Sequence, residues 1–390
     1  MLPENRKIQE PDGTYDVIIV GARVAGAATA LLLARAGLRV VVIDRDERGS
    51  DTLSTHALMR GGAMLLQRWG LLARLRDAGT PLITGTSFHY GDEEIAIALR
   101  SDDDCPGLLA PRRSLLDAVL VDAAEAAGAV FHHRTVLRAL ERERSGRVTG
   151  VGCQPEGGAI HRLRAPLVIG ADGLGSRVAR LVAAPDMITG RYSATNFFAY
   201  VPGSGSRSYH WHYRPGIAAG VIPTNGGQNC VFASMSTSAY DAAPQRAPGS
   251  AFVRILSALS PGLAAASGKP QSLSVFRGRP GHLRHAHGPG WALVGDAGFF
   301  RDPLTAHGMT DALRDAEGLA AAILTGRDSA FAHYQAERDS FAVPLLEVTD
   351  RIVSFSWTMD ELKQLHRDLS STMKAEAAAI AARAPQLQPA

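Results

Sequence analysis

The chain has 390 residues, of which 46% are hydrophobic and 20% are charged, and its formal net charge is +3. This composition is typical of a soluble globular protein, and the near balance of basic and acidic residues gives no electrostatic reason to expect nucleic acid or an acidic membrane as a partner. The three cysteines, Cys105, Cys153 and Cys230, form no CxxC pair, which argues against a disulfide framework or a zinc ribbon. The longest apolar stretch, Val24 to Ala34, is too short to span a bilayer and is no signal peptide, so we expect a cytoplasmic protein.

The N-terminal segment predicts a βαβ unit. Asp16 to Val20 is a β-branched run, an Ala/Leu-rich helical segment ends near Gly37, and Leu38 to Ile43 reads as a second buried strand. A strand, a Gly-containing turn, a helix and a strand within about 30 residues are typical of a parallel nucleotide-binding sheet. A further helix is predicted from Leu58 to Arg68.

The middle of the chain alternates between two kinds of sheet. Thr86 to Tyr90 and Glu94 to Arg100 flank Gly91-Asp92, which predicts a hairpin on a different sheet. A helix is predicted from Ser114 to Ala127 and a buried strand from Leu167 to Gly170. Three segments between these two are predicted to form an antiparallel excursion: Val130 to His132, Val148 to Gln154 and His161 to Arg164.

From about residue 190 to 280, short alternating strands broken by Pro and Gly indicate an inserted β-rich domain. Trp291 to Val294 then predicts a return to the parallel sheet, Thr310 to Leu324 predicts a helix, and the tail from Phe341 to Ala384 is predicted to be mostly helical. The chain is therefore expected to leave the parallel sheet, return to it and finish in helices.

The turn after the first strand has the features of a phosphate-binding loop. A GxGxxG turn lets backbone N–H groups and a helix N-terminus reach a pyrophosphate, while an acidic residue after the next strand takes the ribose hydroxyls. Gly21 and Gly26 stand at the first and third positions, Asp44 closes the second strand, and Arg23 replaces the middle Gly and offers a guanidinium to phosphate. A turn of another βαβ fold is the alternative interpretation. The predicted nucleotide contacts of this unit are Gly21, Arg23, Ala25, Gly26, Asp44 and Arg45.

Two later segments each follow a buried strand: residues 170–173, with the sequence GADG, and residues 294–298, with the sequence VGDAG. The second leads through residues 302–309, DPLTAHGM, into a helix. Together with the first turn, GARVAG, these segments resemble the FAD-dependent monooxygenases of the aromatic-hydroxylase type. The resemblance is greatest to a bacterial subgroup whose next segment reads DTLSTH, as residues 51–56 do here. It covers about residues 14–330, and its three motifs occur in the family's order.

The resemblance implies roles for individual residues. Asp172 would lie by the FAD pyrophosphate, although Asp in an Asp-Gly turn also commonly only caps the turn. Asp296 would bond the ribityl chain, and Arg113 would contact the phosphates and ribose. Backbone N–H groups of Gly308 and Met309, at the start of the helix that the DPLTAHGM segment leads into, would stabilise the negative charge of reduced flavin. The predicted cofactor contacts of these later segments are Arg113, Asp172, Gly295, Asp296, Pro303, His307, Gly308 and Met309; for His307 a structural role is an equal alternative.

The predicted fold is α/β: a Rossmann-like FAD-binding domain with an inserted antiparallel β-sheet substrate domain and C-terminal helices. The FAD-binding domain is expected to be discontinuous, with residues 12–85, 108–185 and 285–335. Residues 86–107 and 186–284 would form the substrate-binding β domain, and residues 336–390 the C-terminal helices.

Around the reacting ring, His56, Arg60 and Trp211 are the predicted catalytic residues, with a surface loop as the alternative for the first two. Period-two geometry places Tyr209, Trp211 and Tyr213 on one face of a strand and the two intervening histidines on the other. An aromatic face suits a planar substrate, but aromatic side chains also cover half-buried sheets in general. Further lining candidates are Phe198, Tyr200 and Met235.

No metal site is predicted. His282, His285 and His287 stand in a Gly/Pro-rich segment with no carboxylate or Cys at a useful spacing. A second GxGxxG turn is absent as well, so NADH or NADPH is expected to bind transiently near the flavin.

The resemblance implies an enzyme in which NAD(P)H reduces FAD and O2 then forms a flavin C4a-hydroperoxide that hydroxylates a small aromatic or electron-rich substrate. Three alternatives stay open: a flavin-dependent reductase of the geranylgeranyl reductase type, a flavin halogenase and a non-catalytic flavin-binding protein. The WxWxIP pattern expected of a halogenase is missing. The sequence does not choose the substrate, the form of the nicotinamide cofactor or the oligomeric state.

Overall fold

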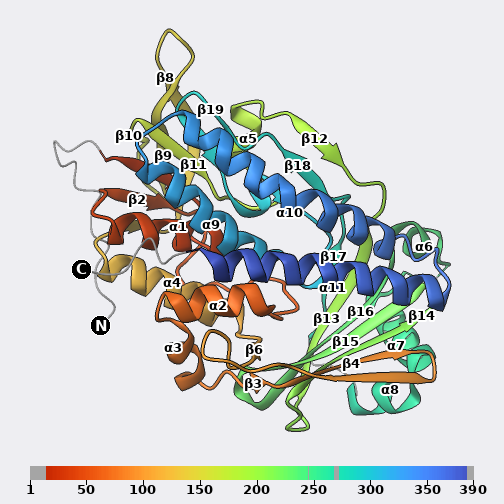
Figure 1. Ribbon diagram of the computed structural model, residues 1–390. Coiled ribbons are helices and arrows are strands. Elements are labelled where there is room, and N and C mark those ends of the chain that lie inside the picture. The colour runs from red at the N-terminus through yellow and green to blue at the C-terminus, as the bar shows by residue number, and fades with distance from the viewer. Residues whose placement is uncertain (1–14, 245, 268–271, 384–390) are drawn as a thin grey trace.

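The computed structural model describes residues 15–244, 246–267 and 272–383 (Figure 1). Residues 12–14 and 384–390, at the ends of the predicted first and last domain segments, lie outside these ranges. Within the described residues, no helix combines the length and the apolarity needed to cross a membrane.

The first sheet has six strands in the order β19-β20-β11-β1-β2-β7. All neighbours pair in parallel except β19, which is antiparallel to β20. The predicted strands at its centre are confirmed within two residues at each end. The strands are β1 (Val17–Val20), β2 (Val40–Ile43), β7 (Val130–His132), β11 (Leu167–Gly170), β19 (His287–Gly288) and β20 (Trp291–Leu293).

The prediction for Val130 to His132 is wrong. This segment does not belong to an antiparallel excursion, because β7 pairs in parallel with β2, with Val130 opposite Val41. The preceding helix α4 (Arg113–Ala126) returns the chain to the same end of the sheet, as a crossover helix must. A strand of three residues is too short for its pattern of apolar side chains to indicate which strand it pairs with. The excursion itself consists of β8 (Thr135–Arg142), which the sequence did not reveal, β9 (Val148–Pro155) and β10 (His161–Arg164).

Helices pack on this sheet. Helix α1 (Val24–Arg35) buries every residue except Arg35, because it lies between the sheet and two further helices, α4 and α9 (Gly308–Leu324). Its Ala- and Gly-rich sequence lets these helices approach closely. Helices α2 (Arg60–Arg68) and α3 (Leu72–Asp77) follow next to them.

The second sheet has seven strands in the order β17-β13-β16-β15-β14-β4-β5 and is antiparallel except for the β14–β4 pair. The predicted hairpin is confirmed, since β4 and β5 pair around Gly91 and join this sheet rather than the first. The domain boundaries proposed from the sequence stay a prediction. The strands are β4 (Gly85–Tyr90), β5 (Glu93–Ala98), β13 (Ala194–Pro202), β14 (Ser208–Arg214), β15 (Ile217–Thr224), β16 (Gln228–Ser236) and β17 (Ser274–Arg277).

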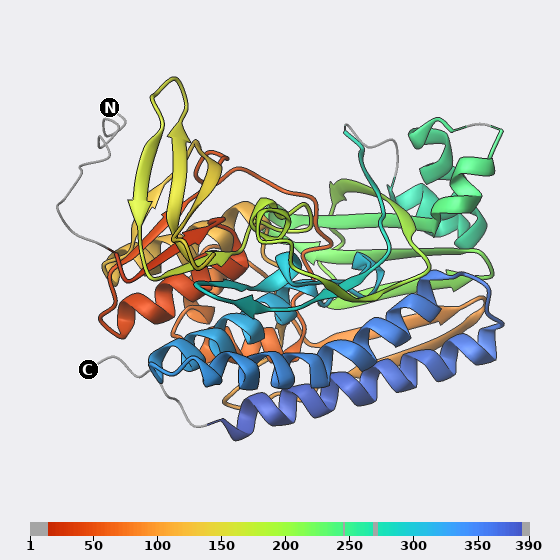
Figure 2. The same cartoon turned by 90° about the horizontal axis from the view of Figure 1, so that it is seen from above.

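The two faces of the second sheet are covered differently. Helices α6 (Thr237–Ala242), α7 (Pro248–Leu259) and α8 (Pro261–Ser267) lie on the outer face, where they close a separate apolar cluster with β13, β15 and β16. Helices α10 (Ser329–Val353) and α11 (Met359–Ala382) run side by side from the first sheet to the second (Figures 1 and 2). The α/β fold with C-terminal helices is thereby confirmed.

Short elements complete the described chain: β3 (Leu82–Ile83), β6 (Leu108–Leu109), α5 (Arg177–Leu181), β12 (Asp186–Thr189), η1 (Asn225–Gly227), β18 (His282–Arg284), η2 (Gly295–Ala297), β21 (Phe299–Phe300) and η3 (Pro303–Thr305). Strands β12, β18 and β21 form a small sheet of their own.

Candidate functional site

The turn after β1 has no room for side chains at its two glycines. Gly21 has a φ of +109°, and a Cβ there would lie 2.3 Å from the carbonyl oxygen of Ala171. A Cβ on Gly26 would lie 1.8 Å from the carbonyl oxygen of Gly21. Helix α1 begins directly after Arg23, and no side chain caps its N-terminus. Its first backbone N–H groups therefore remain available to an anion.

A cleft of about 280 Å³ lies beside this turn and the end of β2. Asp44 stands at its edge and accepts hydrogen bonds from the backbone N–H groups of Ala22 (2.5 Å) and Asp46 (2.7 Å). Arg45, by contrast, is 77% exposed and pairs only loosely with Asp46 at 3.7 Å. The cleft is lined by Ala22, Arg23, Asp44, Asp46, Glu47, Gly49, Ser50, Asp117, Val121 and His133.

Two arginines meet a buried carboxylate at this cleft. Arg113, at the start of α4, contacts Asp117 at 3.2 Å, and Arg23 lies 3.6 Å from the same carboxylate. Burial raises the pKa of Asp117, although both arginines oppose the rise. Nη1 of Arg23 is buried and has no hydrogen-bond partner among the described residues. A phosphate oxygen would satisfy this donor.

The GADG segment follows β11, with Ala171 packed on Gly21. Asp172 accepts hydrogen bonds from the Ser176 hydroxyl (2.5 Å) and from the backbone N–H groups of Arg177 (2.6 Å) and Val178 (3.1 Å). Both of its carboxylate oxygens thus bind the first turn of α5, which is the capping geometry that the sequence left as an alternative.

The third loop brings three separate segments together. A Cβ on Gly295 would lie 2.8 Å from the Cβ of Ala25. A Cβ on Gly308 would lie 4.0 Å from a carboxylate oxygen of Asp296. Burial raises the pKa of Asp296 to about 6, and Arg113 is the nearest charge that opposes the rise. A shifted carboxyl group in such a place is typical of a functional site.

The loop from Asp302 to His307 is held rigidly. Pro303 begins η3, and Asp302 accepts hydrogen bonds from the backbone N–H groups of Leu304 (3.0 Å) and of Ala194 in β13 (2.8 Å). Helix α9 then begins at Gly308 without a side-chain cap, so the N–H groups of Gly308 and Met309 remain available.

His307 faces away from these N–H groups, into a network of buried charges. Its Nε2 contacts Glu376 of α11, and Glu376 also pairs with Arg314 of α9. Arg301 and Arg314 both contact Asp311 (2.9 and 3.0 Å). The sequence analysis missed this network; its signal was the unusual density of charges in the first turns of an otherwise apolar helix.

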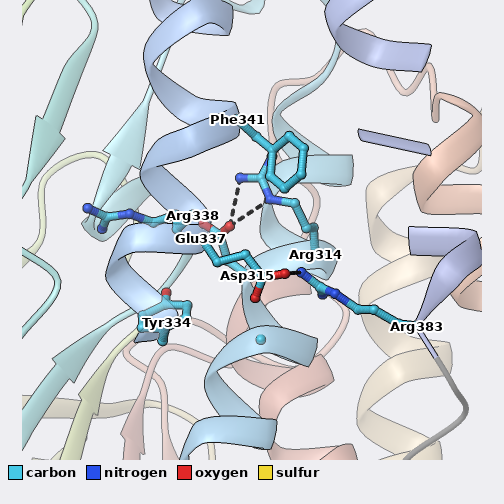
Figure 3. Close-up of a pocket in the computed structure, with 8 residues that line it drawn as sticks. Arg314, Asp315, Tyr334, Glu337, Arg338, Phe341 and Arg383 are labelled. Atoms are coloured by element: carbon cyan, nitrogen blue, oxygen red, sulfur yellow. Dashed lines mark hydrogen bonds and ion pairs between the residues drawn. The ribbon is translucent and has the colours of Figure 1, made fainter. Parts of the chain in front are cut away.

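Figure 3 shows the far end of this network, where α9, α10 and α11 meet around a small pocket of about 180 Å³. Arg314 donates to Asp315 through both Nε (3.1 Å) and Nη2 (2.7 Å), and its guanidinium lies 5.7 Å from the ring centre of Phe341. Arg383, directly after α11, forms an ion pair with Glu337 of α10. The charges here are paired with one another, so they join the three helices.

His56 lies at the junction of the two sheets in an unusual backbone conformation. It is fully buried and has a φ of +62°, the left-handed region that non-Gly residues rarely adopt. Its Nε2 hydrogen-bonds the hydroxyl of Tyr200 in β13, and the two rings stack with centres 5.7 Å apart. Nδ1 has no hydrogen-bond partner among the described residues.

Arg112 completes this cluster. Its guanidinium lies 3.3 Å from the centre of the Tyr200 ring and donates to Oε1 of Gln228 at 2.5 Å. Burial lowers the pKa of His56 to about 3, and the charge of Arg112 lowers it further in the same direction. The sequence analysis named Tyr200 only as a lining residue and missed Arg112, whose signal was its position next to Arg113. We call His56, Arg112 and Tyr200 the junction cluster.

Arg60 and Trp211 lie outside the contacts of the junction cluster. Arg60 donates to the carbonyl oxygen of Arg100 (2.8 Å) and pairs with Asp102, which fastens α2 to that loop. Trp211 is buried, and its Nε1 donates to the Thr86 hydroxyl at 2.9 Å. Their catalytic roles stay predictions.

The alternation predicted for β14 is confirmed, because Tyr209, Trp211 and Tyr213 are buried on one face. Tyr213 packs against His366 of α11, with ring centres 4.7 Å apart. This contact shows that α11 covers part of the aromatic face. Met235 lies with the outer apolar cluster, opposite the face that holds Phe198 and Tyr200, because period two sets it with Val231 and Ala233.

The comparison with known families decides the assignment. Residues 14–349 match the family described as FAD binding domain. The chain therefore belongs to the FAD binding domain family. The assignment to the narrower bacterial subgroup stays a prediction.

Two curated relatives and one solved structure illustrate this family. The chain is 29% identical over 185 residues to squalene monooxygenase 1,1 of Brassica napus, which covers 46% of this chain and 36% of that protein. It is 28% identical over 313 residues, 77% of either chain, to digeranylgeranylglycerophospholipid reductase 1 of Methanopyrus kandleri. The structure of PqsL, a probable FAD-dependent monooxygenase from Pseudomonas aeruginosa, superposes with a TM-score of 0.75 at 21% identity, over 93% of this chain and 100% of PqsL. The chain thus spans little more than a third of the squalene monooxygenase, and the likeness to PqsL is one of fold.

The residues present fit the cofactor that gives the family its name. Gly21 and Gly26 leave a backbone turn that no side chain fills, which is the surface a pyrophosphate needs. Nη1 of Arg23 lies 3.6 Å from Asp117 but has no hydrogen-bond partner among the described residues, and the N-cap residues of α1 and α9 make no side-chain capping bond there. These features come from distant parts of the chain and lie along one edge of the first sheet, at the carboxyl ends of its parallel strands.

Proposed function

We propose that this protein is an FAD-dependent monooxygenase that uses NAD(P)H and O2 to hydroxylate a small aromatic or otherwise electron-rich substrate. In this reaction the substrate gains one oxygen atom, the other leaves as water, and NAD(P)H supplies the two electrons. The flavin, when bound, supplies the electron transfer and the activation of oxygen, and the protein supplies binding, orientation and electrostatics.

Particular residues would hold the cofactor. The turn with Gly21 and Gly26, together with Arg23, would bind the pyrophosphate, and Asp44 would bind the ribose hydroxyls. Arg113, whose charge opposes the rise in the pKa of Asp296, would contact the phosphates and ribose, and Asp296 would bond the ribityl chain. The uncapped N–H groups of Gly308 and Met309 would stabilise negative charge on the reduced ring. Every one of these assignments rests on backbone or side-chain groups described above.

The observation that carries the proposal is the junction cluster. A buried, left-handed His56 costs stability, and such strain persists where the fold uses it. With a pKa of about 3, His56 is neutral at physiological pH. With its proton on Nδ1, the neutral imidazole accepts a hydrogen bond from the Tyr200 hydroxyl through Nε2. The Tyr200 oxygen is then free to accept a hydrogen bond from a substrate.

This arrangement suits a substrate with a hydroxyl or amino group on an aromatic ring. The substrate would donate a hydrogen bond to Tyr200 Oη while Tyr200 donates to His56 Nε2, which would orient the substrate and raise the electron density of its ring. The positive charge of Arg112, held 3.3 Å from the centre of the Tyr200 ring, stabilises the negative charge that develops. A purely apolar substrate would use none of these groups.

A second candidate is a flavin-dependent reductase of alkenes. The observation in its favour is the likeness to the Methanopyrus kandleri reductase over 77% of both chains. Such an enzyme would add two hydrogens to its substrate and consume no oxygen.

The decisive experiment uses the purified, FAD-loaded protein. Anaerobic reduction with NADH or NADPH is followed by the flavin spectrum, and a panel of phenols, anthranilates and quinolones is screened for stimulated NAD(P)H consumption. The product of any hit is then formed under isotopically labelled O2. We expect one labelled oxygen atom in the product. An unlabelled product that has gained two hydrogens would overturn the monooxygenase proposal in favour of the reductase.

A further inference from the structure

A group of histidines lies on the outer face of the second sheet, opposite the aromatic residues of β14. His89 of β4 stands opposite His212 of β14 and opposite Glu94 of β5 in the register of the sheet. His210 lies two residues before His212 on the same face. All three histidines are half-buried and Glu94 is exposed, so solvent reaches the group. This group was not evident from the sequence, because His89 and His210 are 121 positions apart in the chain.

The spacing of the ligand atoms matches a metal site. Nε2 of His89 lies 3.3 Å from Nδ1 of His210, and 3.9 Å from Oε1 of Glu94. Two nitrogens bound to Zn²⁺ at about 2.0–2.1 Å in tetrahedral geometry are about 3.3 Å apart. All three ligand atoms lie within 4.8 Å of one another. The two imidazoles therefore already have the separation that a shared tetrahedral ion requires.

We propose that His89, His210 and Glu94 form a binding site for a divalent transition-metal ion, with Zn²⁺ as the ion that best suits two imidazoles and one carboxylate. His89 would bind through Nε2, His210 through Nδ1 and Glu94 through Oε1, and water would complete the tetrahedron.

The surroundings prepare the imidazoles for this role. His212 stacks on His89 with ring centres 4.1 Å apart and planes 5° from parallel, which fixes the orientation of the His89 ring. The Ser206 hydroxyl lies 3.4 Å from Nε2 of His210, the nitrogen that faces away from the proposed ion.

The ion would join three strands at the edge of the sheet. Strand β4 pairs in parallel with β14, and β5 is the outermost strand, without a further neighbour in this sheet. Helix α7 packs on β14, β15 and β16 on this face. A metal held by β4, β5 and β14 would fix the hairpin of residues 85–98 to the rest of the sheet. This role is independent of FAD, because the site lies on the opposite face from the aromatic residues.

The test uses FAD-loaded protein without a histidine tag, freed of metals by a chelator. Zn²⁺ is titrated by calorimetry, and Co²⁺ is titrated with the visible bands that tetrahedral cobalt shows outside the flavin absorption. We expect one ion per chain, intense tetrahedral cobalt bands, and a Zn²⁺-dependent rise in the unfolding temperature. Removing a ligand with His210→Ala is expected to weaken binding at least about tenfold, and Glu94→Gln, an exposed position, is expected to weaken it without affecting folding.

A matched control is His285→Ala. His285 and His287 form another histidine pair, with ring centres 5.0 Å apart, but no carboxylate joins them in a metal-binding group among the described residues. This variant should bind Zn²⁺ like the wild type. Equal weakening by His285→Ala and His210→Ala, or octahedral cobalt spectra, would mean an adventitious ion only and would overturn the proposal. Flavin reduction should be the same with and without Zn²⁺, so this test and that of the proposed function fail separately.

Discussion

His56 and His307 are both buried histidines, but the protein surrounds them in opposite ways. His307 contacts the carboxylate of Glu376, inside a network whose arginines and carboxylates face one another. His56 contacts a hydroxyl group, has an arginine nearby and is held in a left-handed backbone conformation. Removing one of the buried charges around His307 would leave its partners unpaired inside the protein, whereas the left-handed backbone of His56 costs stability in itself. The difference separates a structural histidine from a candidate functional one.

The largest expected effect comes from removing Glu376, the carboxylate that contacts the structural histidine His307. Glu376→Ala removes the carboxylate that contacts buried His307 and one of the three carboxylates around Arg314, and we expect a loss of about 3–5 kcal/mol in the free energy of unfolding. Urea unfolding measures this loss. Asp360→Ala, at an exposed carboxylate of the same helix, should change stability by less than about 0.5 kcal/mol. A loss below about 1 kcal/mol for Glu376→Ala would contradict the structural role of the contact between His307 and Glu376.

The functional side is tested by Tyr200→Phe, which keeps the ring beneath Arg112 and removes the hydroxyl that His56 holds. We expect kcat to fall about 100-fold with a small change in stability, because the variant loses the oxygen that would accept the hydrogen bond of the substrate. The control is Tyr209→Phe, at a buried hydroxyl that donates to the Leu109 carbonyl at 2.7 Å, outside the junction cluster. It should lose about 1 kcal/mol of stability and keep its turnover. Equal turnover in both variants would contradict the proposed role of Tyr200.

Gly21→Ala tests the proposed cofactor turn, where we expect the backbone rather than a charged side chain to make the contact. The added Cβ meets the Ala171 carbonyl at 2.3 Å, so the turn must shift. We expect the affinity for FAD to fall roughly 10–100-fold, as the fluorescence of released FAD would report. Gly37→Ala adds a Cβ at another positive φ, +85°, with open space around it. Its FAD affinity should be unchanged; a drop equal to that of Gly21→Ala would point to general destabilisation.

The smallest expected effect is that the contributions of Asp296 and Glu376 to the free energy of unfolding depend on pH in opposite ways. Burial raises the pKa of Asp296 to about 6 from 3.8, so the folded apoprotein keeps this proton up to a higher pH than the unfolded chain does. Its contribution to stability is therefore present at low pH and falls as the pH rises from about 4 to 6. Burial alone would raise the pKa of Glu376, but His307 and Arg314 hold it below its ordinary value. The contribution of Glu376 is thus present at neutral pH and is lost only as the pH falls.

Urea unfolding of the apoprotein between pH 4 and 7 checks these signs. Relative to the wild type, Asp296→Asn should gain stability as the pH rises toward 6, and Asp360→Asn should follow the wild-type curve. A parallel curve for Asp296→Asn would show that this carboxyl group does not titrate in the window.

Local rules predicted most of the first sheet. The turn with Gly21 and Gly26 follows from steric limits that act within a few residues, and β11 was predicted residue for residue, because a short apolar run between polar residues has few alternatives. The strand from Val130 to His132 was assigned to the wrong sheet, since its three residues do not encode a partner. Strand β8 was not predicted, because charged residues interrupt the alternation of apolar and polar residues along it.

The sequence by itself determined the kind of cofactor loop, the hairpin at Gly91 and which residues of β14 share a face, since backbone sterics and side-chain periodicity act locally. Only the tertiary structure decided which faces meet: His56 with Tyr200 across 144 residues, His307 with Glu376 across 69, and His89 with His210 across 121. Periodicity tells which side of a strand or helix a residue occupies. The packing of the whole chain decides what lies opposite, and that contact sets the charge, the strain and the chemistry of each histidine.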